Sequence, residues 1–204
     1  MISKKALEIL NYIKENSKED NLEIRLNYSK LAYAKGEPFS SGYFDQPDEK
    51  QNIKYPLLVV GIDKEESQWI EVLLHEYNHF LQWKNQTPAW KEYIDLYKDY
   101  NEGDEESFEQ LETTVNMESE CESNTIKLAK ELNYDINPSR YIQKVNAYLV
   151  FYQIYAEKKE WYKSAPFEDN DILKLMPSDK IIKKPMRYEI NSELYSYYLK
   201  HLII

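Results

Sequence analysis

The feature that most constrains this chain is a pair of histidines four residues apart, His75 and His79, inside the apolar run Leu73–Leu81. Residues at this spacing lie on one side of an α-helix, about one turn apart, so both imidazoles can reach a single ion if the segment is helical. Glu76, next to the first histidine, can then face a water molecule held on that ion. We therefore expect a largely buried helix over 68–86, with Ser67 as its cap.

The order His-Glu-x-x-His is the short motif of zinc metallopeptidases, in which the two histidines are metal ligands and the glutamate is the general base. The chain has only three histidines, and two of them lie in this motif. An accidental match is expected in about 0.5% of chains with this composition. The alternative interpretation is a helix whose histidines merely cap or pack.

Composition limits what surrounds this helix. The chain has 204 residues, of which 42% are hydrophobic, and its 4 glycines argue against a β-sandwich or barrel. The net charge of -10 disfavours nucleic acid and anionic membranes as partners. No apolar run reaches transmembrane length, and a lone Cys121 excludes an intrachain disulfide and fits a reducing compartment. We expect a cytoplasmic protein that acts on a peptide or protein; the sequence does not indicate an oligomeric state.

Hydrophobic periodicity predicts an α+β, helix-rich fold with a small sheet next to the motif helix. The segment 55–62 is continuously apolar, which predicts a strand buried on both faces and an edge with which an extended peptide could pair. The segment 36–54 is rich in turn residues and predicts loop. The other predicted elements are strands at 22–26 and 187–190 and helices at 3–18, 88–100, 105–133, 138–163 and 191–203. We expect one domain over 1–204, with the sheet and motif helix in 1–86 and a helical part in 87–204.

A catalytic zinc ion takes three protein ligands and leaves its fourth position for water. No third histidine follows His79 at short spacing, and His201, near the last residue, is expected to be a surface or packing histidine. The helix 105–133 offers Glu118 and Glu122, which fall on its apolar stripe with Cys121 beside them. A buried carboxylate needs a partner, which could be a bound cation or a lysine or arginine at the helix edge. Periodicity alone leaves both possibilities open.

The segment Met117–Glu122, followed by Ile126, Leu128 and Ala129, resembles the Glu-x-x-Ala-Asp pattern of gluzincin metallopeptidases. The resemblance implies that Glu118 is the third zinc ligand and that Glu122 supports the site, for example by a hydrogen bond to a zinc-bound histidine. Cys121 and Glu122 stand where the pattern has alanine and aspartate. The thiolate of Cys121 could itself bind zinc, although we interpret it as a small packed residue. Further segments, among them 41–45 and 146–148, are similar to small phage-associated metallopeptidases.

The implied activity is zinc-dependent hydrolysis of peptide bonds. A zinc ion held by His75, His79 and Glu118 lowers the pKa of its bound water towards ~7, and Glu76 takes the proton and hands it to the leaving amine. Tyr148 and Tyr43 are candidates for the donor that stabilises the oxyanion. The alternative is a catalytically weak or inactive zincin-fold protein with a binding or regulatory role.

Overall fold

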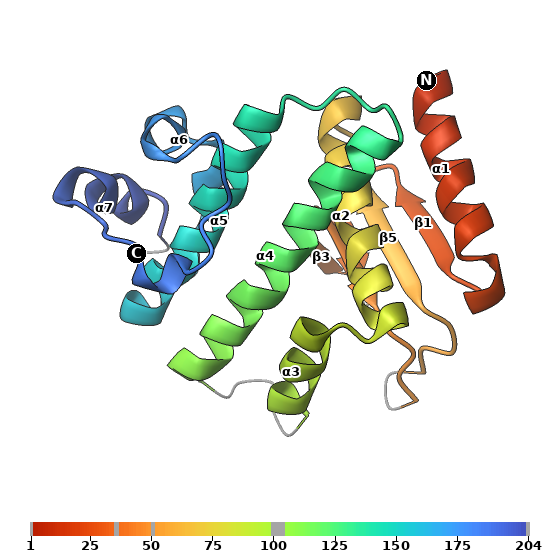
Figure 1. Ribbon diagram of the computed structural model, residues 1–204, viewed down its shortest axis with the longest axis horizontal. Coiled ribbons are helices and arrows are strands. Elements are labelled where there is room, and N and C mark those ends of the chain that lie inside the picture. The colour runs from red at the N-terminus through yellow and green to blue at the C-terminus, as the bar shows by residue number, and fades with distance from the viewer. Residues whose placement is uncertain (1, 35–36, 50–51, 99–104, 203–204) are drawn as a thin grey trace. The chain divides into compact units, whose positions relative to one another are not determined.

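The computed structural model describes residues 2–34, 37–49, 52–98 and 105–202 (Figure 1). Seven α-helices and a small three-stranded sheet within these residues form the α+β fold that the sequence predicts. The chain divides into two compact units, described separately below: the first has residues 1–87 and 124–136, and the second has residues 88–123 and 137–204. Whether the two units make the single domain expected over 1–204 depends on how they join, so that expectation stays a prediction.

The first unit contains a mixed sheet with the strand order β1-β5-β4. β1 (Glu23–Asn27) runs parallel to β5 (Leu57–Gly61), and β4 (Gly42–Asp45) runs antiparallel to it. β5 is therefore the central strand, and both of its edges are paired. The expectation that this strand offers an edge to an extended peptide is wrong, because β4 and β1 already occupy its two sides.

Helix α2 (Glu66–Asn85) carries the His-Glu-x-x-His motif and packs against β4 and β5 (Figure 1). It begins before the predicted boundary: Glu65 is the N-cap, without a side-chain hydrogen bond, and Ser67 lies inside the first turn instead of capping it. The apolar side chains expected in the interior are found there or at its border: Ile70, Leu73, Leu74 and Phe80 are buried, and Val72 and Leu81 are half-buried. The sheet thus lies next to the motif helix, as predicted.

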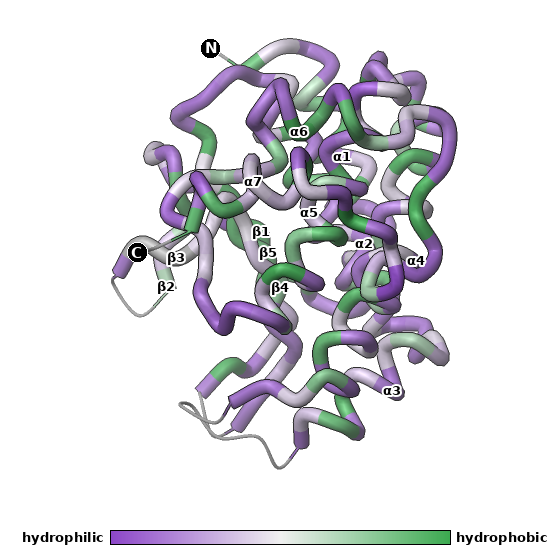
Figure 2. The backbone as a smooth tube through the Cα atoms, turned by 90° about the vertical axis from the view of Figure 1, so that its left-hand side faces the viewer, coloured by the Kyte–Doolittle hydropathy of each residue, from purple (hydrophilic) through white to green (hydrophobic). Residues whose placement is uncertain are grey.

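β5 is buried along its whole length, which explains its apolar sequence. Figure 2 colours the backbone of the sheet by the hydropathy of each residue. Leu58 and Val60 lie opposite Phe44 and Gly42 of β4, and this face of the sheet is covered by α2. Leu57 and Val59 point to the other face and pack around Ala32. Ala32 belongs to β2 (Ala32–Ala34), which pairs with β3 (Glu37–Ser40) in a second, two-stranded sheet.

The region 36–54 was predicted as mostly turn and loop, and that prediction missed two strands, β3 and β4, which both lie within it. Each of these strands has only four residues. Such a length is too short for a period of two to be recognised, and pairing partners distant in the sequence decide the conformation. These pairings place β4 beside β5 and against α2, with Gly42 next to Val72 and Phe44 against Phe80.

Helix α1 (Lys4–Asn16) confirms the predicted helix at 3–18. The hydroxyl of Ser3 caps it by accepting from the N–H of Ala6 at 3.1 Å. The ammonium of Lys5 donates to the carbonyl of Leu132 at 2.6 Å, which ties α1 to the segment after α4 (Phe108–Glu131). From Asn124 onward α4 belongs to this first unit, and its earlier turns belong to the second.

The second unit is helical. Its core surrounds α5, where Ala147, Val150 and Phe151 are fully buried. The elements in it besides the early turns of α4 are α3 (Pro88–Tyr97), α5 (Pro138–Lys158), η2 (Pro166–Glu168), α6 (Asn170–Leu175), η3 (Pro185–Arg187) and α7 (Ser192–Leu199).

Several boundaries in this unit differ from the prediction. The helix expected over 138–163 stops at Lys158, because Lys159 takes a left-handed φ of 55°. The strand expected at 187–190 is absent from the described residues, where a 3₁₀ turn ends at Arg187. α6 was not predicted. No helix among the described residues combines the length and the apolar character that a membrane span requires.

Candidate metal centre

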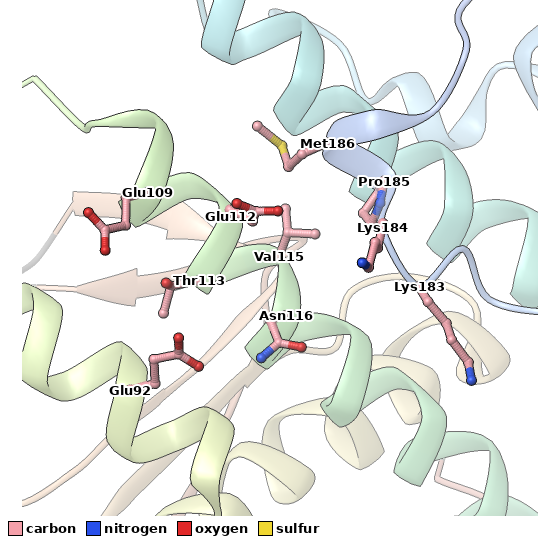
Figure 3. Close-up of a pocket in the computed structure, with 10 residues that line it drawn as sticks. All are labelled: Glu92, Glu109, Glu112, Thr113, Val115, Asn116, Lys183, Lys184, Pro185 and Met186. Carbon is pink, nitrogen blue, oxygen red and sulfur yellow. The ribbon is translucent and has the colours of Figure 1, made fainter.

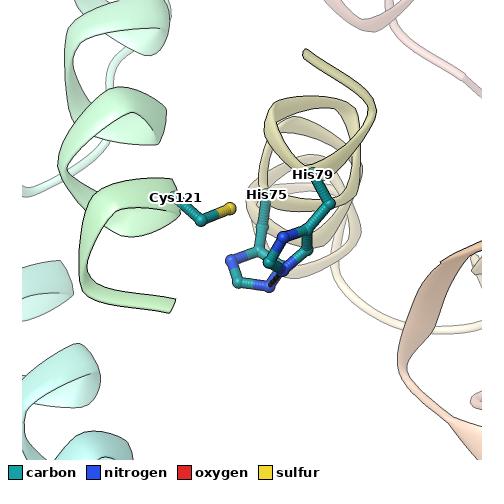
Figure 4. Close-up of side chains that lie close together, drawn as sticks. All are labelled: His75, His79 and Cys121. Carbon is teal, nitrogen blue, oxygen red and sulfur yellow. Dashed lines mark hydrogen bonds between the residues drawn. The ribbon is translucent and has the colours of Figure 1, made fainter. Parts of the chain in front are cut away.

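The two histidines of the motif converge on one side of α2. Nε2 of His79 lies 3.0 Å from Nε2 of His75, and the rings are almost perpendicular, with an interplanar angle of 88° (Figure 4). Two nitrogens bound at 2.0–2.1 Å to a tetrahedral ion are about 3.3 Å apart. The pair therefore needs to open by only a few tenths of an ångström to hold a zinc ion.

Gln82 fixes the orientation of His79. Its Oε1 lies 2.9 Å from Nδ1 of His79, and its side chain is almost completely buried. An amide oxygen only accepts hydrogen bonds, so Nδ1 carries the proton and Nε2 presents its lone pair on the side of His75. Gln82 was not predicted as a residue of the site. Its position three residues after His79, on the inward face of the helix, is the signal that could have found it.

Glu76, the predicted general base, is buried on α2 against β4. A methyl group on Gly42 would stand 3.2 Å from Cγ of Glu76 and 2.5 Å from Cγ1 of Val72. The missing side chain at Gly42 therefore lets the strand lie directly on this turn of the helix. Phe44, two residues further along β4, packs edge-on against Phe80 with ring centroids 6.0 Å apart.

The late part of α4 is fastened to α2 inside the first unit. The side-chain amide of Asn78 donates to the carbonyl of Leu74 at 2.8 Å and to the hydroxyl of Thr125 at 3.2 Å. Asn78 directly precedes His79 on the motif helix, so these two hydrogen bonds lie next to the metal centre in the sequence. Cys121 lies one helical turn before Thr125, on the same side of α4.

Cys121 joins the two histidines in a group of possible metal ligands. Its sulfur and one ring nitrogen from each of His75 and His79 lie within 4.8 Å of one another (Figure 4). The described residues contain one such group of three or more His, Cys, Asp or Glu side chains. The thiol of Cys121 is buried and forms no disulfide. Imidazole and thiolate are donors that zinc prefers, so the chemistry of this set fits a zinc ion.

Glu118, the predicted third ligand, is buried three residues before Cys121, and the inward orientation inferred from periodicity is confirmed. It is not a member of the three-residue group. Within the second unit its charge acts on Tyr93 and Tyr152: burial raises the pKa of each hydroxyl, and Glu118 raises it further. The assignment of Glu118 as a metal ligand stays a prediction.

Glu122 is also buried, and it accepts a hydrogen bond from the hydroxyl of Tyr141. Its predicted role, support of a zinc-bound histidine, stays a prediction. For His79 the Nδ1–H bond goes to Gln82. The two tyrosines considered as oxyanion donors have partners too: the hydroxyl of Tyr148 lies 2.8 Å from that of Tyr152, and the hydroxyl of Tyr43 donates to the carbonyl of Tyr33 at 2.9 Å.

A separate open groove of about 300 Å³ lies in the second unit, with carboxylates from α3 and α4 and lysines from the segment that leads into η3 (Figure 3). It contains none of the predicted site residues. Its lining consists of Glu92, Glu109, Glu112, Thr113, Val115, Asn116, Lys183, Lys184, Pro185 and Met186.

Comparison of the whole chain with protein-family models, with curated proteins and with solved structures finds no match.

Proposed function

We propose that the chain is a zinc-dependent peptidase of the gluzincin type that hydrolyses a peptide or protein substrate in the cytoplasm. The observation that carries this proposal is the approach of the two Nε2 atoms of His75 and His79 to 3.0 Å, next to a buried Glu76. The burial matters because a carboxylate removed from bulk water is held in place and acts more strongly on a nearby proton.

A zinc ion bound by these histidines supplies Lewis acidity and a water molecule with a lowered pKa. Glu76 would accept a proton from the attacking water and later give it to the leaving amine, so one carboxylate would serve as base and then as acid. Gln82 keeps the proton of His79 on Nδ1, which leaves Nε2 available to the ion. β4 packs on α2 at Gly42 and therefore limits the space beside Glu76.

Metal content tests the first part of the proposal. The purified chain should contain one zinc ion by atomic absorption, and His75→Ala and His79→Ala should each lose it. The matched control is His201→Gln, which changes the histidine outside the motif and should keep the full zinc content. A wild-type chain that takes up no zinc after dialysis against the metal would overturn the proposal.

Turnover tests the second part. Glu76→Gln should keep the zinc ion and lose cleavage of a proteome-derived peptide library by about 10²–10⁴-fold. Glu109→Gln, an exposed glutamate on α4, is the control and should cleave like the wild type. Cleavage that survives in Glu76→Gln would remove Glu76 from its proposed role.

The thiol of Cys121 favours the second candidate function, a metal-stabilised protein that binds or regulates. If Cys121 and Glu118 both bound the ion with the two histidines, four protein ligands would leave no place for water, as in structural zinc sites. Cys121→Ala separates the two functions. A peptidase would keep its zinc and its activity, whereas a closed site would lose zinc affinity and show no cleavage in any variant.

A further inference from the structure

Ser164, His201 and Asp169 form a continuous hydrogen-bonded chain in the second unit. Nδ1 of His201 lies 2.7 Å from the hydroxyl oxygen of Ser164, and Nε2 lies 2.9 Å from Oδ2 of Asp169. His201 was expected to be an ordinary surface or packing histidine. Its side chain is only 14% exposed, which fits a packing histidine, and both ring nitrogens are engaged. None of these three residues belongs to the proposed zinc centre.

Asp169 is held in place by the helix that it caps. Its Oδ1 accepts from the N–H groups of Asp171 at 2.7 Å and of Ile172 at 3.4 Å, at the start of α6, so Oδ2 is directed at the imidazole. Burial acts to raise the pKa of Asp169, but the hydrogen bonds from His201 and from these two backbone groups outweigh it and lower that pKa. Asp169 is therefore ionised at neutral pH.

The backbone holds His201 next to Ser164. The N–H of Lys163 donates to the carbonyl of His201 at 2.6 Å, and Tyr162 pairs with Leu202 in an isolated antiparallel bridge. The segment that carries the serine and the segment that carries the histidine are thus paired main chain to main chain. Ser164 itself is exposed, so its hydroxyl is accessible to a substrate while its two partners are half-buried.

These contacts give each side chain a defined chemical role. A carboxylate can only accept, so Asp169 takes the proton-bearing Nε2 of His201 as its donor, and the lone pair of the imidazole lies on Nδ1, facing the Ser164 hydroxyl. This is the division of roles in a Ser-His-Asp triad, with the two ring nitrogens exchanged relative to the arrangement of serine proteases. The histidine is the base, and the aspartate fixes its tautomer.

We propose that Ser164 is a nucleophile towards activated carboxylic esters, with His201 as its general base and Asp169 as the residue that positions His201. The serine oxygen forms a bond to the acyl carbon while its proton passes to Nδ1 of His201. The carbon–oxygen bond to the leaving alcohol then breaks, and that alcohol takes the proton. Water releases the acyl group from Ser164 by the same proton route, which restores the free hydroxyl.

A fluorophosphonate probe on the full-length chain tests this proposal. The serine oxygen bonds to phosphorus, the phosphorus–fluorine bond breaks, and the serine proton passes to His201 as fluoride leaves. Peptide mass mapping should place one label on Ser164, and Ser164→Ala should remove it. Mapping is required because the chain has 19 tyrosines, whose hydroxyls also react with such probes. The label should persist in Glu76→Gln and after zinc is chelated.

Two variants test the roles of the partners with little change of shape. Asp169→Asn keeps a residue that caps helices well but removes the carboxylate that fixes the imidazole tautomer. His201→Gln keeps a hydrogen-bonding side chain but removes the base. Each should slow labelling of Ser164 and hydrolysis of p-nitrophenyl acetate by about 10²–10⁴-fold. Ser196→Ala, which changes an exposed serine of α7, is the control and should react like the wild type.

Folding of every variant is checked by circular dichroism before the rates are compared. A wild-type chain in which Ser164 stays unlabelled would overturn the proposal. So would equal labelling rates in the wild type and in a folded His201→Gln chain. Either result would mean that the three residues only fasten the C-terminal segment to residues 162–169.

Discussion

Gln82 acts on the metal centre through a single hydrogen bond, and that bond can be removed with little other change. Gln82→Leu keeps the size of the side chain but takes away the acceptor of the His79 Nδ1–H. Zinc affinity in a competition titration should fall by about 10–100-fold, the usual effect of losing such a partner. Gln68→Leu, at an exposed position of the same helix, is the control. Equal affinities in the two variants would show that Gln82 is only a packed residue.

Gly42 offers a test of the contact between β4 and the general base. In Gly42→Ala the new methyl group would meet Cγ1 of Val72 at 2.5 Å and Cγ of Glu76 at 3.2 Å, so the turn that carries Glu76 must shift. Overpacking of this kind costs about 1–3 kcal/mol of unfolding free energy. We also expect peptide cleavage to fall.

The control for this prediction is built into the contact. Val72→Ala removes the atom that is closest to the new methyl group, so the double variant Gly42→Ala/Val72→Ala should recover part of the lost stability and activity. The carbonyl oxygen of Val59, 3.0 Å from the methyl position, limits that recovery. Losses in the double variant that equal the sum of the two single losses would contradict the proposed clash.

At the scale of elements, what the sequence could predict depended on how local each signal is. Four-residue spacing within one helix is local, so His75, Glu76 and His79 were placed correctly on α2, and the inward face of α4 followed from its own periodicity. β4 was missed because its four residues gain their conformation by pairing with β5. Cys121 was interpreted as a packed residue because no motif or spacing along the chain relates it to the two histidines with which it forms a group of possible ligands.

The hydrogen bond from Asn78 of α2 to Thr125 of α4 gives a prediction at the same scale. Thr125→Val removes the hydroxyl that accepts from the buried amide of Asn78 but nearly preserves the shape of the side chain. A buried donor left without this acceptor costs about 1–3 kcal/mol. The midpoint of urea unfolding should fall accordingly. Thr125→Ser, which keeps the hydroxyl, should lose less, and an order reversed between the two variants would show that packing of the methyl group dominates.

At the scale of the whole molecule, buried and half-buried tyrosines make the stability sensitive to alkaline pH. Burial raises the pKa of Tyr93 to about 12, and it raises the pKa values of Tyr77, Tyr148, Tyr152 and Tyr198 above their ordinary range as well. In the unfolded chain each hydroxyl ionises near pH 10. Above that pH the unfolded state therefore holds fewer protons than the folded state, and unfolding is favoured as the pH rises.

The stability that these neutral tyrosines contribute is complete below about pH 10 and is lost as the pH rises from there through the folded pKa. Each hydroxyl that stays protonated only in the folded state changes the free energy of unfolding by about 1.4 kcal/mol per pH unit in that window. Tyr93→Phe removes one such group, so its unfolding free energy should fall less steeply between about pH 10 and 12 than that of the wild type.

Tyr28→Phe, at a side chain that is 87% exposed, is the control and should follow the wild-type slope. Urea unfolding at a series of pH values, with tyrosinate absorbance recorded in parallel, measures both slopes. If the Tyr93→Phe and wild-type slopes coincide, Tyr93 ionises as readily in the folded chain as in the unfolded one, and the half-buried position of its side chain does not raise the pKa of its hydroxyl.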